Sequence, residues 1–344
     1  MARPLNIFLH SYGTYLHVKD QLFEIKIPEE NGRTRKEEIP PKKVKSIWLS
    51  PHTALSSSAV ALALKFNIDI VFLENNGTPL GRIWHSKLGS TTLIRKKQLA
   101  ASLDQRAVRT IRNWLTRKLD NQLELLQSLG KHRKAARADL ADRCDRIAAL
   151  AQSITRAEAL QIDEIADQLR GWEGTAGRLY FGMLSQVLPT NYQFSGRSFR
   201  PAKDVFNALL NYGYGILYSR TERALMLAGI DPYVGFLHRD DYNHRSMVFD
   251  FIEPYRAWID LPVFRLCSGK KVNQEHYESL ADGVGLTKTG RQLCSQAVID
   301  YLDDDKIKYK NRKTSRANVM QMQAYAFANE LIGKDGELPE LMML

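Results

Sequence analysis

The chain is poor in cysteine and has no long apolar run. Its three cysteines, Cys144, Cys267 and Cys294, stand far apart without a CxxC pair. This spacing argues against a disulfide framework and against a structural zinc site, since both depend on paired thiols. No segment is apolar over the length needed to cross a bilayer, which argues against membrane attachment.

The first residues also lack the features of a secretory signal. Met1–Ile7 is followed by charged and polar residues, and not by an apolar stretch with a small-residue cleavage site. The 344 residues, 44% of them apolar, are enough for a sizeable core and for two domains. We therefore expect a soluble, globular protein of the cytoplasm.

Positive charge is what the chain has in excess. Lysine and arginine number 49 against 38 aspartate and glutamate, so the net charge is 49 − 38 = +11, and the pI is about 9.4. This balance favours a polyanionic partner, because each bound phosphate releases counterions. Ribosomal and membrane-surface proteins share it, so it indicates a class of partner and not a function.

The first quarter of the chain has a β pattern. Six short segments rich in β-branched and aromatic residues are separated by turn residues: Asn6–Leu9, Tyr15–Val18, Leu22–Ile27, Val44–Leu49, Ile68–Leu73 and Pro79–Trp84. Asn31-Gly32 and Asn76-Gly77 are typical of hairpin turns. Serines before an Ala/Leu run predict one helix at Ser56–Phe66. We predict a small antiparallel, β-sandwich-like domain over residues 1–88.

After Gly89 the period changes to that of helices. Apolar residues recur every three or four positions from Leu103 to Leu126, which predicts a long amphipathic helix. The remaining pattern is mainly helical, so residues 89–344 are predicted to form a larger all-α domain and the whole chain an α+β protein. A solvated face is the simplest interpretation of the basic residues that crowd the polar side of the long helix: Lys96, Lys97, Arg106, Arg109, Arg112, Arg117 and Lys118.

Glu173 is the first residue with a chemically unusual position. Gly171 is expected to end one helix, and the next would begin at about Glu173, in line with Ala176 and Tyr180 on a buried stripe. A carboxylate on such a stripe is costly unless it is paired. The alternative is an ordinary acid in a first helical turn, where the helix dipole favours it.

A second cluster lies between Gly235 and Arg256. Asp250 and Glu253 interrupt an apolar and aromatic run, and their i, i+3 spacing lets both carboxylates face one way. A capping box, with Asp250 as N-cap and Glu253 at N3, is the structural alternative. His238 ends another apolar stretch and has the alternative of a core histidine. Taken together, one histidine and up to three carboxylates without a cysteine ligand suit Mg²⁺ or Mn²⁺.

Four motifs in order resemble the CRISPR spacer-acquisition integrase family, the Cas-one family. They begin with Glu173-Gly-Thr-Ala-Gly-Arg-Leu-Tyr-Phe and continue with the block from Arg200 to Tyr214. Gly235-Phe-Leu-His238 and Phe249-Asp250-Phe-Ile-Glu253-Pro-Tyr-Arg256 complete the set. The resemblance covers most of the helical part, and a β-rich start before a helical remainder is also typical of this family.

The resemblance implies a metal-dependent endonuclease and integrase. Glu173, His238 and Glu253 would bind Mg²⁺ or Mn²⁺, with Asp250 supporting this catalytic site. The family enzyme joins the 3′-hydroxyl ends of a short DNA duplex, the spacer, to a CRISPR repeat by direct transesterification. It is implied to be a homodimer formed through the β domain, and two such dimers hold a central dimer of the Cas-two protein. The expected partners are therefore double-stranded DNA from protospacer and repeat, a second copy of the chain and the Cas-two dimer.

Several basic residues are candidates for holding the DNA ends: Arg178, Arg200, Arg245, Lys270 and Lys288. Where many relatives have a compact hairpin between the histidine and the aspartate, this chain has Asp240–Arg245. His244 in that segment is either an additional ligand or an exposed loop residue.

Two other functions are compatible with the sequence. A stand-alone nuclease acting on branched DNA would use the same metal site with water as the nucleophile. A basic DNA-binding assembly subunit would use the acidic residues only to cap helices.

Overall fold

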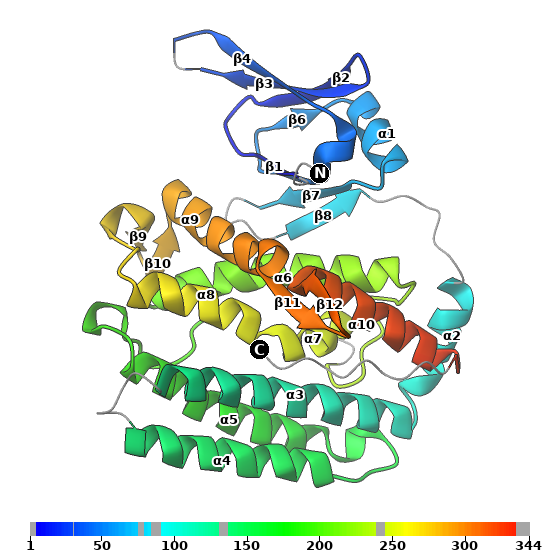
Figure 1. Cartoon of the computed structure of the whole chain (residues 1–344), viewed down its shortest axis with the longest axis vertical. Coiled ribbons are helices and arrows are strands. Elements are labelled where there is room, and N and C mark those ends of the chain that lie inside the picture. The colour runs from blue at the N-terminus through cyan, green and yellow to red at the C-terminus, as the bar shows by residue number, and fades with distance from the viewer. Residues whose placement is uncertain are drawn as a thin grey trace. The chain divides into compact units, whose positions relative to one another are not determined.

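The computed structural model describes residues 5–29, 31–74, 79–83, 91–130, 137–238 and 245–334. It divides into two compact units, Met1–Leu88 and Gly89–Leu344 (Figure 1). The first unit is rich in strands and the second is mainly helical, which confirms the predicted order of a β-rich and a helical part. Among the described helices, none is long and apolar enough to span a membrane.

Among its described residues, the first unit contains two four-stranded sheets and one α-helix. One sheet has the order β1 (Leu5–Leu9), β5 (Val44–Leu49), β7 (Asp69–Leu73) and β8 (Pro79–Ile83). The other has the order β4 (Thr34–Ile39), β3 (Leu22–Pro28), β2 (Tyr15–Lys19) and β6 (Ala54–Leu55). Helix α1 (Ser57–Lys65) begins where expected, because the Ser56 side chain accepts a hydrogen bond from the Ala59 N–H at 3.1 Å. A turn of 3-10 helix, η1, covers Pro41–Lys43.

The prediction of a purely antiparallel domain was wrong. Strands β1 and β5, β5 and β7, and β2 and β6 are parallel pairs. Parallel neighbours need a crossover connection, and α1 lies within the one that joins β5 to β7. Strand β4 was not predicted, because its residues Arg35–Glu38 are all charged and it lies at a sheet edge, where charge is tolerated.

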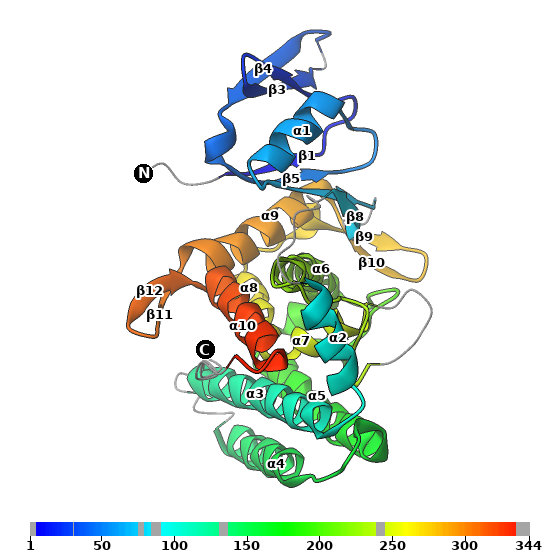
Figure 2. The ribbon, with the colours of Figure 1, turned by 90° about the vertical axis from the view of Figure 1, so that its right-hand side faces the viewer.

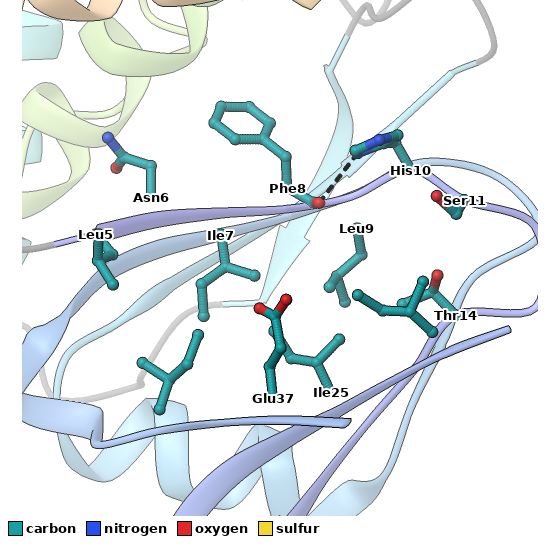
Figure 3. Close-up of a pocket in the computed structure, with 12 residues that line it drawn as sticks. Leu5, Asn6, Ile7, Phe8, Leu9, His10, Ser11, Thr14, Ile25 and Glu37 are labelled. Carbon is teal, nitrogen blue, oxygen red and sulfur yellow. Dashed lines mark hydrogen bonds between the residues drawn. The ribbon is translucent and has the colours of Figure 1, made fainter. Parts of the chain in front are cut away.

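Residues from both sheets and α1 share one apolar core, which includes Ile7, Phe23, Ile47 and Leu62. Beside it, a cavity of about 240 Å³ lies under β1 (Figure 3). Strand alternation points Ile7 and Leu9 into this cavity and Phe8 away from it, as Figure 3 shows. The cavity is lined by residues of the first unit alone, none of which belongs to the predicted catalytic set.

The second unit is built from nine described helices. They are α2 (Thr91–Ala101), α3 (Gln105–Gly130), α4 (Arg137–Arg156), α5 (Ala166–Gln186), α6 (Val205–Leu227), α7 (Ser246–Phe251), α8 (Ala257–Ser268), α9 (Lys288–Ile299) and α10 (Arg316–Leu331). Short turns of other helix types are η3 (Ile162–Glu164), η4 (Thr190–Tyr192), η5 (Glu253–Tyr255), η6 (Gln274–His276) and η7 (Asp300–Asp304). Helix α6 is buried over most of its length and packs against α8, α9 and α10, near the centre of this unit in Figure 2.

The helical unit is not all-α, so that prediction was wrong. Strands β9 (Tyr277–Leu280) and β10 (Gly283–Leu286) form one hairpin, and β11 (Lys306–Tyr309) and β12 (Arg312–Ser315) form another. Each strand has only four residues, too few for a clear period in the sequence. In the second hairpin, Lys310 and Asn311 have positive φ angles, as a two-residue hairpin turn requires.

Candidate active site

Glu173 lies inside a continuous helix. Helix α5 runs from Ala166 through Gly171 to Gln186, so the predicted break at Gly171 and the first-turn explanation for Glu173 were both wrong. Ala176 and Tyr180 are fully buried on the same stripe, as predicted. The Glu173 side chain is 34% exposed, which places its carboxylate at the edge of the core.

Glu253 begins the turn η5 between α7 and α8, and its side chain is only 5% exposed. Arg256, one turn later, donates from Nε to Glu253 Oε1 at 2.9 Å. Burial alone would raise the pKa of Glu253, but the positive charges of Arg256 and Lys118 outweigh it and lower the pKa to about 2. The carboxylate is therefore held in its charged form inside the protein.

Lys118 of α3 joins the two glutamates. Its ammonium group donates a hydrogen bond to Glu173 Oε1 and lies 2.5 Å from Glu253 Oε2. The side chain is 7% exposed, so the prediction that Lys118 belongs to a solvated face was wrong. Burial lowers the pKa of Lys118, but the negative charges of Glu253 and Glu173 raise it by a larger amount. The pKa of Lys118 therefore lies above its ordinary value.

One oxygen of this cluster lacks a hydrogen bond. Glu253 Oε2 is buried and accepts none from the described residues, although Lys118 Nζ lies close to it. A buried carboxylate oxygen normally has a hydrogen-bond donor or a metal ion beside it. Lys118 therefore supplies the positive charge that lies beside this oxygen.

Asp250 builds the loop that carries His238. Its carboxylate is fully buried and accepts hydrogen bonds from the backbone N–H groups of Phe236 at 2.5 Å, Leu237 at 3.0 Å and His238 at 3.1 Å. The capping-box explanation was therefore wrong. Asp250 lies within α7, and the residue that precedes η5 is Ile252, which has no side-chain cap.

The same carboxylate orients the histidine ring. His238 Nδ1 lies 2.6 Å from Asp250 Oδ1, and because a carboxylate only accepts, Nδ1 carries the proton. Nε2 is then the nitrogen with which His238 would bind a metal. The ring is 36% exposed, so it is not a core histidine. Burial lowers the His238 pKa, but the hydrogen bond and charge of Asp250, with the charge of Glu253, raise it overall.

Gly235 lets the histidine loop approach α7. A Cβ atom at this position would lie 2.4 Å from Ser246 Cβ and 2.5 Å from the His238 carbonyl oxygen, closer than real contacts allow. The loop is also tied to α5, since Arg170 donates to the Leu237 carbonyl at 2.9 Å. Helix α3 in turn holds η5, because Asn121 donates to the Pro254 carbonyl at 2.7 Å.

A buried network fixes the helices beneath the site. Tyr180 of α5 and Tyr214 of α6 donate hydrogen bonds to the two carboxylate oxygens of Asp260 on α8, at 2.8 and 2.6 Å. Burial raises the pKa of Asp260, although both tyrosine hydroxyls oppose this shift. Asp260 thereby links the helix of Glu173 to the helix that follows Glu253.

The predicted ligands are brought together in two pairs. Glu173 and Glu253 meet on Lys118, and His238 meets Asp250. The charge of Glu253 contributes to the raised pKa of His238. Within the described ranges, no three His, Cys, Asp or Glu side chains converge tightly enough to hold a metal. The chemistry of the donors nevertheless fits Mg²⁺ or Mn²⁺: carboxylate oxygens, one of them without a hydrogen bond, and an oriented imidazole.

The predicted DNA contacts are dispersed over the helical unit. Arg178 on α5, Arg200 before α6, Lys270 after α8 and Lys288 at the start of α9 are exposed. Arg245 instead forms an ion pair with Glu222 of α6 at 3.1 Å. His244 and the segment 239–244 lie outside the described residues.

Sequence reasoning missed two charged residues of the cluster, Lys118 and Arg256. Lys118 follows Leu115 by three positions and precedes Gln122 by four, which places it beside buried residues of α3. That spacing was the sequence feature that could have predicted a buried Lys118. Arg256 stands in the motif that contains Glu253, one helical turn later, and was given no role.

Comparisons with known proteins identify the family of this chain. Residues 7–299 match the profile of the family described as CRISPR associated protein Cas1. The chain is 33% identical to the CRISPR-associated endonuclease Cas1 1 of Archaeoglobus fulgidus, over 93% of this chain and 94% of that one. A casposase bound to integration product has the same fold, with a TM-score of 0.82 at 21% identity, covering 98% of this chain and 95% of that one.

A Cas6-RT-Cas1–Cas2 complex contains the fold within a longer chain, with a TM-score of 0.78 at 21% identity, covering 99% of this chain and 36% of that one. The family profile covers the residues that carry both glutamates, the histidine and the aspartate. The chain belongs to the Cas1 family of CRISPR-associated proteins.

Proposed function

We propose that this protein is a metal-dependent integrase that inserts short DNA duplexes into a CRISPR repeat by 3′-hydroxyl transesterification. Two observations carry the proposal: Glu173 and Glu253, from separate elements, converge on one buried cation, and Asp250 orients the ring of His238. Membership of the Cas1 family supports it, as does the likeness to a casposase bound to integration product.

Each residue of the site has a separate task. Glu173 and Glu253 supply carboxylate oxygens and His238 supplies Nε2 as ligands for Mg²⁺ or Mn²⁺, and Asp250 fixes the imidazole. When bound, the metal polarises the target phosphate and offsets charge on its oxygens during in-line displacement. Arg256 keeps Glu253 ionised, so this ligand is ready to bind a cation at neutral pH.

The proposed partners are DNA, a second copy of the chain and a Cas2 dimer. One solved relative is a Cas1–Cas2 assembly, and another is a complex of a Cas1 protein with DNA. Integration joins the two donor ends at two points of a repeat. Because one active site in one chain does not reach both points, an oligomer is expected. We assign dimerisation to the β-rich unit, as the family resemblance implies.

A nuclease is the second candidate, because several curated relatives are named endonucleases. The two activities differ in the nucleophile, which is a DNA 3′-hydroxyl for integration and water for cutting. We therefore expect that a donor duplex with free 3′-hydroxyl ends is joined to a repeat-containing plasmid in Mn²⁺, and that a donor with 3′-dideoxy ends is not. Joined product is measured on a gel with labelled donor, with and without a Cas2 partner. Plasmid cutting that is equal with both donors, without joining, would favour the nuclease.

The hairpin of β11 and β12 has charge suited to a DNA backbone. Lys308 and Lys313 are exposed and lie directly opposite each other, an arrangement that costs stability for like charges. Within the described part of the chain, neither forms an ion pair. Figure 2 shows this hairpin standing out from the helices of its unit.

Replacing both lysines with glutamine is expected to weaken DNA binding at every sequence and to lower the salt-dependence slope by about one to two, because each phosphate contact contributes roughly 0.9. Fluorescence anisotropy at several salt concentrations measures both effects. The matched control is Lys42→Gln with Lys43→Gln, two exposed lysines of η1. Equal losses in the two double variants would indicate a general charge effect and not a surface at the hairpin.

A further inference from the structure

Lys118 occupies the space between two predicted metal ligands. Its ammonium contacts an oxygen of each glutamate, yet it belongs to a third element, α3. A lysine buried to this degree on an amphipathic helix is costly to desolvate, and its two carboxylate partners offset that cost. The arrangement thus holds Glu173 and Glu253 together with a monovalent cation from the protein itself.

The two contacts of Lys118 differ, and the oxygen of Glu253 is the one open to a second cation. Lys118 donates its hydrogen bond to Glu173, while Glu253 Oε2 accepts none from the described residues. A divalent ion binds carboxylate oxygens without needing a hydrogen-bond direction and brings twice the charge. Arg256 already satisfies Glu253 Oε1, so Oε2 is the oxygen left for a cation.

We propose that Lys118 is a built-in counterion that competes with the divalent metal for Glu173 and Glu253. This inference rests on the proposed metal site. In the metal-free protein, Lys118 neutralises both carboxylates and keeps the site folded. Metal and ammonium use the same oxygens, so they exclude each other, and metal binding has to release Lys118 from the pair. The affinity of the site for metal is then set partly by a residue that is not a ligand.

The test compares the wild type with Lys118→Met, which keeps the length of the side chain and removes its charge. Mn²⁺ binding is measured by the loss of the free Mn²⁺ electron paramagnetic resonance signal. We expect Lys118→Met to bind Mn²⁺ roughly tenfold more tightly or better, because a positive charge beside the two carboxylates no longer competes with the metal. Melting in a chelator should occur at a lower temperature than for the wild type, and added Mn²⁺ should raise it by more.

Arg117→Met is the matched control, because it removes one positive charge from the next position of the same helix. Lys118→Gln, whose amide still donates to Glu173, replaces Lys118→Met if the latter does not fold. The same increase in Mn²⁺ affinity is expected for it. Unchanged or weaker Mn²⁺ binding in the Lys118 variants, with a wild type that binds, overturns the competition alone. Absence of binding in the wild type and in the Lys118 variants overturns the metal site as well. Equal tightening in Arg117→Met also overturns the proposal, since the effect is then one of net charge.

Discussion

A His238→Ala variant is expected to lose metal-dependent DNA joining by more than about 100-fold while remaining folded. Loss of a residue that only orients a metal ligand typically costs 10- to 100-fold, so loss of a ligand should cost more. The fold should persist, because the ring is 36% exposed and Asp250 keeps its three backbone hydrogen bonds in the variant. Joined product formed over time in Mn²⁺ measures activity, and thermal melting measures the fold.

The exposed His10 of the first unit offers the control. His10→Ala removes an imidazole far from the predicted ligands in sequence and should leave joining within about threefold of the wild type. If His238→Ala also joined DNA at the wild-type rate, His238 would not be a ligand, and the site would have to be built from the two glutamates alone.

Much of the fold was predictable from local patterns. Short segments rich in β-branched and aromatic residues gave β1, β2, β3, β5 and β7 almost to the residue, and the helical period from Leu103 to Leu126 gave α3. Local sequence patterns do not predict whether two paired strands are parallel or antiparallel, because similar residues occur in both kinds of pair. The parallel pairs around β5 were therefore missed. Gly171 was misjudged for a related reason: packing of α5 stabilises the helix beyond the local preference of one glycine.

The identity of the candidate site residues was easier to predict than their partners. The motifs singled out Glu173, His238 and Glu253, and the structure brings the two glutamates together. Their shared cation, Lys118, lies 55 residues before Glu173, and no local spacing relates the two. The role of Asp250 depends on a loop 12 to 14 residues earlier in the chain, so its i, i+3 relation to Glu253 pointed to a cap instead.

Asp250→Ala is expected to lower the free energy of unfolding by about 3–5 kcal/mol. The substitution leaves the backbone N–H groups of Phe236, Leu237 and His238 without their acceptor in a buried position, and each such group costs about 1–3 kcal/mol. Urea denaturation in a chelator measures this loss without a contribution from metal. A loss below about 1 kcal/mol would mean that the loop finds other acceptors.

Asp250→Asn separates stability from the orientation of the ring. An asparagine oxygen in the place of Oδ2 still accepts from Phe236 and Leu237, so the expected loss of stability is smaller, about 1–2 kcal/mol. Its NH₂ group, in the place of Oδ1, is a donor toward His238 Nδ1. The ring then has to accept at Nδ1 and carry its proton on Nε2, the nitrogen assigned to the metal.

The affinity of Asp250→Asn for the metal should therefore fall by about 10- to 100-fold, although the variant loses little free energy of unfolding. Mn²⁺ titration and urea denaturation of the same samples compare the two effects. A variant that lost stability but kept wild-type Mn²⁺ affinity would show that Asp250 only supports the loop. Because the Asn substitution preserves size and most hydrogen bonds, a selective loss of metal binding would instead identify Asp250 as the residue that sets the tautomer of His238.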